Sequence, residues 1–315
     1  MRSRGALLGL HVALVSLLGC SHAPGLAPED DGELLAPDAG AEDGGTNVSL
    51  SICARYGAPV RTGNNPAALP ELSGLAASRR HPGVFWAHND SGNALEVFAL
   101  REDGTVAARI PLTGASNVDV EDIAVGPCAE GSCILLGDIG DNKEVRPQLH
   151  LYRLPEPEVL DDTPRAVTDL PFRYEDRAHN AESLVVDPVN GTPWILTKGL
   201  FTLGDVYRVE GLGQADGGVA VKVGKLQNPG LDQLSTGASA HPGAPEVLVR
   251  SYSRVWRFRA PAGGTLEEAL LSSPVEVPGP SQPQSEAIAW LPGGRGYLVG
   301  TEGAGEGLFR VECAP

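Results

Sequence analysis

A polar position followed by a short apolar run recurs five times along the chain, and this repeat limits the folds that the sequence can form. The repeated stretches are LPELSGLAAS, VDVEDIAVG, HNAESLVVD, LSTGASAHP and PQSEAIAWL. The shared polar position, called here the slot, is occupied by Ser73, Glu121, Glu182, Thr236 and Glu286. Successive slots are 48, 61, 54 and 50 residues apart, a period typical of chains that repeat one supersecondary unit.

Each copy of the repeat continues with two further short apolar segments, and four of the copies have one more. In the second copy these segments are SCILLGDIGDN, QLHLYRLPEPE and LPFRYED. The 40 glycines and 26 prolines supply turns, and residues 263–273 are the best candidate for a short helix. Four antiparallel strands per copy predict an all-β fold, a β-propeller of five four-stranded blades. Six blades remain the alternative if a long segment between copies holds a degenerate blade.

The last copy reaches the end of the sequence before a fourth strand appears. Residues 46–57, TNVSLSICARYG, precede the first copy and belong to no other. We expect this N-terminal strand to pair with the last blade, which would close the ring and leave no open sheet edge.

The cysteines bear on this arrangement. Cys128 and Cys133 flank a turn between a first and a second strand, which favours a hairpin disulfide. Cys53 and Cys313 would be neighbours if the N-terminal strand closes the ring, so we expect a second disulfide there. Four cysteines allow three pairings, and an exported protein permits disulfides.

The N-terminus carries an export signal. Arg2 and Arg4 form a basic region, residues 5–18 form an apolar region, and LLGC at 17–20 resembles the bacterial lipobox. We therefore expect a signal peptide over residues 1–19 and lipidation of Cys20. Ser21 in the next position favours the outer membrane. An ordinary signal peptide with an incidental cysteine is the alternative.

An acidic segment separates the signal from the repeats. Residues 20–45 are rich in Ala, Pro, Gly and acidic residues and contain no Lys or Arg, which predicts a flexible tether before a domain at 46–315. The formal net charge of the chain is −16. Such a charge disfavours nucleic acid and anionic membrane surfaces as partners. We expect a monomer that contacts the membrane through the lipidated Cys20 alone.

Polar residues gather where the fold would bring them together. In a propeller the first strand of each blade lines the channel, and the start of that strand and the end of the second strand share one face. The residues expected on this face are Ser73, His88, Asn89, Asp90, Glu121, Asp122, Asp138, Asp141, Asn142, His179, Asn180, Glu182, Lys198, Thr236, Arg250, Glu286 and Glu302. Polar residues at strand ends also cap backbone groups and form turns. For any one of these residues taken alone, a structural role is therefore a better explanation than a functional one.

Three slot glutamates suggest a metal site. Glu121, Glu182 and Glu286 would face one another across the channel, where carboxylates repel, raise one another's pKa or recruit a cation. Lys198 and Arg250 would offset part of this charge. Calcium is the expected ion because carboxylate and carbonyl oxygens are its ligands, and no His pair has the spacing of zinc ligands.

These features leave the function open among three classes. The first is a binding module that holds calcium and a small or polymeric ligand. The second is a metal-assisted hydrolase of phosphoesters, lactones or glycosides, with His88, His179, Glu182 and Glu286 as catalytic candidates and Asp138 or Glu121 as a base. The third is a metal-free scaffold for an envelope protein or polysaccharide. The sequence has no G-x-S-x-G elbow and no P-loop, so it does not decide whether the protein is an enzyme.

The motifs ELSGLAAS, WAHNDSG, DVEDIAV and NAESLVV resemble the SdiA-regulated family of extracytoplasmic propellers and the related phytase-linked esterase-like domains. The resemblance covers the chain from about Glu71 onward. It implies a propeller, sometimes with bound calcium, and no firmly assigned reaction. The chain differs from these families at Asp122, Ser183 and Ala287, where they tend to have glycine, and the fourth copy has no acid in its slot.

Overall fold

The computed structural model describes residues 53–199, 201–228 and 234–315. All of these belong to one of the two compact units of the chain, Val48–Pro315. The expected signal peptide, the tether and residues 46–52 of the expected N-terminal strand lie outside the described residues. Within the described part of the chain, no helix is both long enough and apolar enough to cross a membrane.

The described chain is an all-β, propeller-like domain with a single short helix, and the strands follow the copies of the repeat. The strands are, in chain order, β1 (Val60–Asn64), β2 (Leu72–Ala77), β3 (Phe85–Asn89), β4 (Glu96–Leu100), β5 (Val106–Thr113), β6 (Val120–Cys128), β7 (Gly131–Asp138), β8 (Leu149–Pro155), β9 (Arg165–Ala166), β10 (Thr168–Tyr174), β11 (Ala181–Val186), β12 (Pro193–Thr197), β13 (Asp205–Glu210), β14 (Gly218–Lys225), β15 (Ser235–Ala240), β16 (Glu246–Ser251), β17 (Val255–Arg259), β18 (Val275–Val277), β19 (Ser285–Trp290), β20 (Gly296–Thr301) and β21 (Gly307–Glu312).

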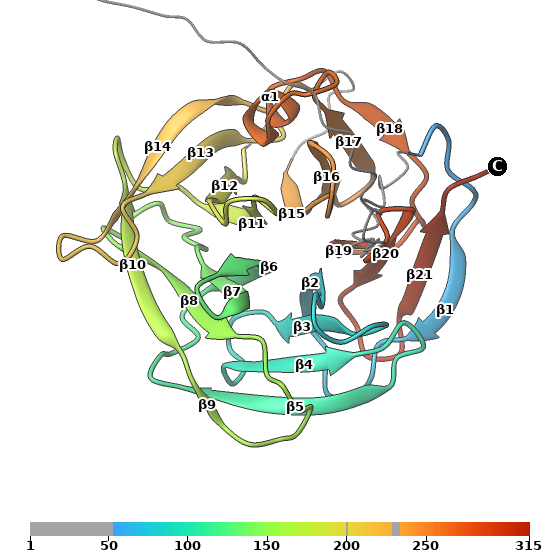
Figure 1. Cartoon of the computed structure of the whole chain (residues 1–315), viewed down its shortest axis with the longest axis horizontal. Coiled ribbons are helices and arrows are strands. Elements are labelled where there is room, and N and C mark those ends of the chain that lie inside the picture. Colours follow the sequence, from blue (N-terminus) through green and yellow to red (C-terminus); the bar gives the residue numbers. More distant parts are fainter. Residues whose placement is uncertain (1–52, 200, 229–233) are drawn as a thin grey trace, which may run out of the picture. The chain divides into compact units, whose positions relative to one another are not determined.

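The first strand of each copy lies innermost. Figure 1 shows β2, β6, β11, β15 and β19 around the centre, with later strands of each copy progressively farther out. Each of these inner strands also contacts the inner strand of the next copy, and β19 contacts β2. The slots at the start of the inner strands therefore meet near one axis.

Successive strands of a copy pair antiparallel, but the copies are not all separate sheets. β10 pairs with β14 in parallel, which joins the second and third copies into one eight-stranded sheet. β9 adds to β5 in the same way. These parallel pairs occupy backbone donors and acceptors of outer strands that would otherwise form open edges.

The strand that pairs with the last copy starts later than the sequence predicted. β1 begins at Val60 and runs antiparallel to β21, whereas the expected segment ended at Gly57. Of that segment, Tyr56 forms one isolated bridge with Cys313. Pro59 stands between the bridge and β1, and proline has no N–H to donate to a ladder, so regular pairing begins only after it.

The core lies between neighbouring sheets. Trp86, Phe172, Tyr207 and Phe258 are among its largest buried side chains. One apolar cluster combines side chains of the second and third copies, and another combines the first and second. Inner strands such as β11 are buried at every position, because sheets pack against both of their faces. Their apolar runs therefore lack the alternation of a half-exposed strand.

The short helix and both disulfides were predicted correctly. Helix α1 (Leu266–Leu270) is capped by Thr265, which forms a capping box with Glu268. Cys53 is bonded to Cys313 with a Cα separation of 5.3 Å, and Cys128 to Cys133 with a Cα separation of 5.8 Å.

The two disulfides should contribute unequally to stability. The Cys53–Cys313 bond closes a loop with a sequence separation of 260, against 5 for Cys128–Cys133. The chain-entropy relation gives about 5.5 kcal/mol for the long loop and about 2 kcal/mol for the short one. We expect urea unfolding to show a larger loss for the Cys53→Ser/Cys313→Ser protein than for the Cys128→Ser/Cys133→Ser protein. Equal losses would show that the bond between the chain ends does not restrain the unfolded chain.

Candidate functional site

The pairing of each inner strand with its neighbour changes register at the slot. The ladder passes from Leu72 to Gly74, from Val120 to Asp122, from Ala181 to Ser183, from Ser235 to Gly237 and from Ser285 to Ile288. In each copy the slot residue is thus left out of the ladder, as in a β-bulge. Bulges redirect side chains and are frequent beside functional sites. The repeated polar position of the sequence is therefore a repeated bulge.

Two slots use a hydroxyl to bind the next inner strand. The Ser73 hydroxyl donates to the Glu121 carbonyl at 2.6 Å, and the Thr236 hydroxyl donates to the Ser285 carbonyl at 2.7 Å. These bonds give the two buried carbonyls a donor on the neighbouring strand. Ser73 and Thr236 are structural residues.

The other three slots bring carboxylates together. Glu121, Glu182 and Glu286 are 5–7 % exposed. Burial raises the pKa of each, and the neighbouring carboxylates add to the effect for Glu121. Burial together with Glu302 and Glu182 raises the pKa of Glu286 to about 9. The sequence prediction that these glutamates influence one another agrees with these pKa shifts.

Lys198 neutralises one of the three. Its ammonium group forms an ion pair with Glu182 and donates to the Tyr252 hydroxyl at 2.9 Å. Arg250, the other expected counter-charge, is buried elsewhere, and its charge interacts with Tyr297. Burial lowers the pKa of Arg250 to about 10. Of Lys198 and Arg250, only Lys198 therefore offsets the negative charge of the slot glutamates.

Asp90, Asp119 and Glu121 form the tightest group of acids. Carboxylate oxygens of the three all lie within 4.8 Å of one another. Burial raises the pKa of both Asp90 and Asp119, although the Ser91 hydroxyl and Arg146 oppose the shift at Asp119. Sequence reasoning missed Asp119, which stands two residues before the slot in the second copy. The first copy has Glu71 at the same position, and the other three have Asn180, Leu234 and Gln284.

Gly140 leaves room for this group. A Cβ atom at Gly140 would lie 2.3 Å from Glu121 Oε1 and 2.4 Å from Asp119 Oδ2. Contacts this short do not occur in folded proteins, so any side chain at this position would displace both carboxylates. We call Asp90, Asp119 and Glu121, with Glu182, Glu286, Glu302 and Lys198 around them, the acidic cluster.

Residues at the end of β7, in the loop after it and before β11 are bound to one another and to their neighbours. Asp138 is fully buried, forms an ion pair with Arg146 at 2.8 Å and accepts the Tyr152 hydroxyl at 2.8 Å. Asp141 accepts the Arg146 N–H at 2.6 Å. Asn180 accepts the Asp141 N–H at 2.7 Å and donates to Asn142 at 3.3 Å. These four predicted residues, Asp138, Asp141, Asn142 and Asn180, hold the loops in place.

Asn89 and His88, at the end of β3, also have structural partners. The Asn89 side chain accepts the Glu71 N–H at 3.1 Å and donates to the Ala68 carbonyl at 2.9 Å. His88 Nδ1 lies 2.9 Å from the Asn89 carbonyl oxygen. Burial lowers the pKa of His88 to about 4, which keeps its ring neutral near pH 7. Its Nε2 is buried without a hydrogen-bond partner among the described residues.

Asp122 ties three inner strands together. Its carboxylate accepts the N–H groups of Ile123 at 2.8 Å, Leu184 at 2.8 Å and Ala238 at 3.2 Å, which belong to β6, β11 and β15. Burial raises the pKa of this carboxyl against the opposing effect of the three bonds. A Cβ atom at Gly74 would lie within 3 Å of both Asp122 Oδ1 and His88 Nε2, so these groups form one polar layer between the inner strands.

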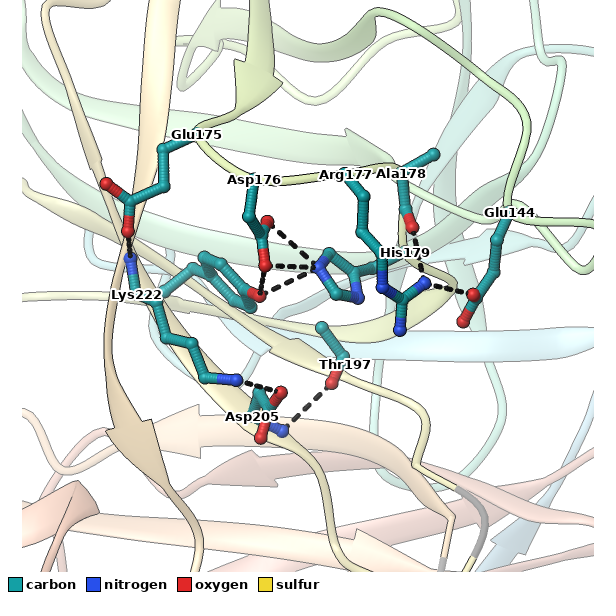
Figure 2. Close-up of polar contacts among 10 residues, drawn as sticks. Glu144, Glu175, Asp176, Arg177, Ala178, His179, Thr197, Asp205 and Lys222 are labelled. Carbon is teal, nitrogen blue, oxygen red and sulfur yellow. Dashed lines mark hydrogen bonds and ion pairs between the residues drawn. The ribbon is translucent and has the colours of Figure 1, made fainter.

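His179 is held in a network of its own. Figure 2 shows its ring beside Asp176. His179 Nε2 lies 3.0 Å from the Asp176 carboxylate and 2.8 Å from the Tyr207 hydroxyl. The neighbouring Arg177 is paired with Glu144. His179 is 5 % exposed, and its Nε2 is occupied. The network fixes the loop before β11, and with it the position of Asn180 and Glu182, so His179 acts here as a positioning residue.

Comparisons with known proteins do not assign a function to the chain. No protein-family model and no curated protein matches the chain. Similar solved structures are a gluconolactonase from Xanthomonas campestris (13% identity, TM-score 0.47, covering 84% of this chain and 97% of that chain), a PQQ-bound aldose sugar dehydrogenase from Streptomyces coelicolor (12%, 0.46, 83% and 99%) and an auxiliary nutrient binding protein from Bacteroides thetaiotaomicron (13%, 0.42, 82% and 60%). At these identities and TM-scores, none assigns an activity to the chain.

Loss of the Asp122 carboxylate should destabilise the domain. Asp122→Ala leaves three buried N–H groups without acceptors, at about 1–3 kcal/mol each, so we expect a loss of about 3 kcal/mol or more in urea unfolding. Asp122→Asn retains one acceptor oxygen and should lose less. The exposed Asp216→Ala serves as the control and should change little. A loss below about 1 kcal/mol for Asp122→Ala would contradict the role given to this carboxylate.

Stability without divalent cations should fall as the pH rises. The pKa of Glu286 is about 9 in the folded domain and 4.5 ordinarily, so the folded state holds a proton that the unfolded state has released. The free energy of unfolding then decreases between about pH 5 and pH 9. We expect Glu286→Gln to show a smaller decrease in urea unfolding with EDTA at pH 5, 7 and 9. The same decrease in both proteins would show that this carboxyl does not carry the effect.

Proposed function

We propose that the chain is an exported lipoprotein whose domain is a β-propeller of five four-stranded blades. The pairing of β1 with β21 supports closure of the ring by the N-terminal segment, and the five innermost strands support the blade count. The lipobox-like LLGC supports a signal peptide over 1–19, anchoring through Cys20 and an outer-membrane location, with the tether at 20–45 as spacer.

We further propose that the acidic cluster binds a divalent cation, calcium by preference, through Asp90, Asp119 and Glu121. The observation that carries this proposal is the approach of three carboxylates within 4.8 Å beside a glycine whose Cβ would collide with two of them. Calcium is a hard cation that takes six to eight oxygen ligands. A cation there would remove the repulsion that these acids otherwise exert on one another.

This ligand set differs from the three slot glutamates suggested by the sequence. Glu121 belongs to both sets. Glu182 is already paired with Lys198, and Glu286 lies beside Glu302 with a pKa of about 9. Neither belongs to the group of acids whose carboxylate oxygens lie within 4.8 Å of one another.

Three carboxylates leave part of the coordination of calcium open. Oxygen atoms of a bound molecule, such as the hydroxyls or carbonyl of a sugar-like compound, would complete it beside Glu286, Lys198 and Tyr252. We propose this binding of a small or polymeric oxygen-rich ligand as the function of the domain. The strong negative charge of the cluster disfavours an anionic ligand unless the cation is present.

Metal-assisted hydrolysis is a second candidate function, favoured by Glu286. A buried carboxyl that holds a proton near pH 7 can act as a general acid toward a substrate held by the neighbouring cation. Turnover of lactone, phosphoester or glycoside substrates that requires calcium and is lost in Glu286→Gln would establish it. His88 and His179 are not proposed as bases, because the first is enclosed and the second is occupied by Asp176 and Tyr207.

Calcium should stabilise the protein against heat, and the effect should depend on specific acids. A ligand that binds only the folded state at 100 times its Kd adds about 2.7 kcal/mol. We expect the Tm to rise with CaCl2 in the natural protein and not in Asp119→Asn or Glu121→Gln. Glu182→Gln, the matched control, should retain the rise because Lys198 occupies that carboxylate.

Gly140→Ala gives a second test that does not change any charge. It should weaken the response to calcium while leaving the Tm in EDTA nearly unchanged, because the atoms it displaces are the ends of side chains. Loss of the response in Glu182→Gln but not in Asp119→Asn would favour the three slot glutamates instead. No response to any divalent cation would favour a metal-free scaffold.

A further inference from the structure

A cavity of about 430 Å³ lies at the end of the inner strands opposite the acidic cluster. Its wall is built from residues of all five inner strands that follow the slots, and from the turns after four of these strands. These residues include Ala77, Val125, Val186, Ala240 and Trp290. The volume falls within the range of small-molecule sites, which are usually about 300–1,000 Å³.

Most of the residues that line this cavity are apolar, and its polar side chains are those of Ser78, Arg79 and Ser239. Aliphatic side chains and Trp290 form the wall, and four prolines contribute from the turns after inner strands: Pro82, Pro188, Pro242 and Pro292. Proline has a fixed φ and lacks an N–H group, so these turns present a preformed rim with fewer polar groups than other residues would give. An apolar molecule that enters the cavity would therefore displace water from few polar groups of the rim.

Arg79 is the only charged residue among the described residues that line the cavity. Its backbone is fixed because Glu156 accepts the Arg79 N–H at 3.2 Å, the Ser78 hydroxyl at 2.6 Å and the Trp86 indole N–H at 2.7 Å. Its exposed guanidinium group makes one long hydrogen bond, 3.4 Å, to the Pro188 carbonyl. Most of its donors are therefore available to an anion at the rim.

The cavity and the acidic cluster are separate sites. The residues that line the cavity include no member of the acidic cluster, and on β6 the lining begins at Ile123, two residues or roughly 7 Å along the strand from Glu121. The polar layer of Asp122 and His88 lies between them. An anionic molecule would be repelled by the acidic cluster and attracted by Arg79. The two sites therefore favour ligands of opposite charge.

We propose that this cavity binds an amphipathic small molecule with an apolar body, such as fused or linked rings or a short acyl chain, and one anionic group that pairs with Arg79. The apolar body fills the space between the inner strands, and the carboxylate or sulfonate lies at the proline rim. This site is independent of the cation site and does not require calcium.

Fluorescence titration with 1-anilinonaphthalene-8-sulfonate, an apolar anion, tests the proposal on the folded protein. We expect saturable binding of one molecule per chain, weakened about fivefold by Arg79→Gln as fits an exposed ion pair. Arg80→Gln is the matched control, because Arg80 is the adjacent arginine and faces Glu158 instead of the cavity. The uncharged N-phenyl-1-naphthylamine should bind equally to all three proteins.

Filling the cavity separates this site from nonspecific adsorption. Ala240→Trp should abolish binding of both dyes, and Ala77→Phe serves as the second variant if the first lowers the Tm. Unchanged dye binding in a filled variant of natural Tm would overturn the proposal. Equal effects of Arg79→Gln and Arg80→Gln, or no saturable binding of either dye, would also overturn it.

Discussion

A register shift at the start of every inner strand is the constraint on which the rest of the structure depends. Inner strands converge near one axis, and the edge of each that faces its neighbour has no ladder partner. The shift leaves the slot residue of each copy out of the ladder, and bulges of this kind redirect side chains. Where that residue is Ser73 or Thr236, it satisfies a neighbouring carbonyl. Where that residue is glutamate, its carboxylate is buried, and burial raises its pKa.

The two ends of the inner strands differ in character for the same reason. Polar slots at one end gather acids whose pKa values are raised by burial, and Lys198 neutralises one of them. The apolar runs that follow the slots end in the cavity rimmed by prolines. Asp122 stands between the ends and uses its carboxylate to bind backbone donors of three strands. Along β6, for example, the charged slot residue Glu121 is followed by Asp122, which binds the backbone, and then by the apolar residues that line the cavity.

The strands, the helix, both disulfides and the convergence of the slots were predictable from the repeat, because the period and turn residues are local signals. The start of β1 was not, since it depends on where Pro59 falls relative to β21. The sequence placed Lys198 and Arg250 alike as counter-charges to the glutamates. It did not indicate that Lys198 pairs with Glu182 whereas the charge of Arg250 interacts with Tyr297. Asp119 was missed because it stands two residues before its slot, and the residues of the slots themselves were the signal used. His179 became a positioning residue through Tyr207, which lies 28 residues away.

Diffraction from crystals of the protein soaked in terbium chloride tests the central claim most directly. Terbium replaces calcium at oxygen-rich sites and scatters anomalously, so its position does not depend on any assumption about ligands. We expect an anomalous peak bounded by the carboxylates of Asp90, Asp119 and Glu121, next to Gly140. A peak between Glu182 and Glu286, or no peak within the acidic cluster, would contradict the assignment of these three acids as the cation ligands.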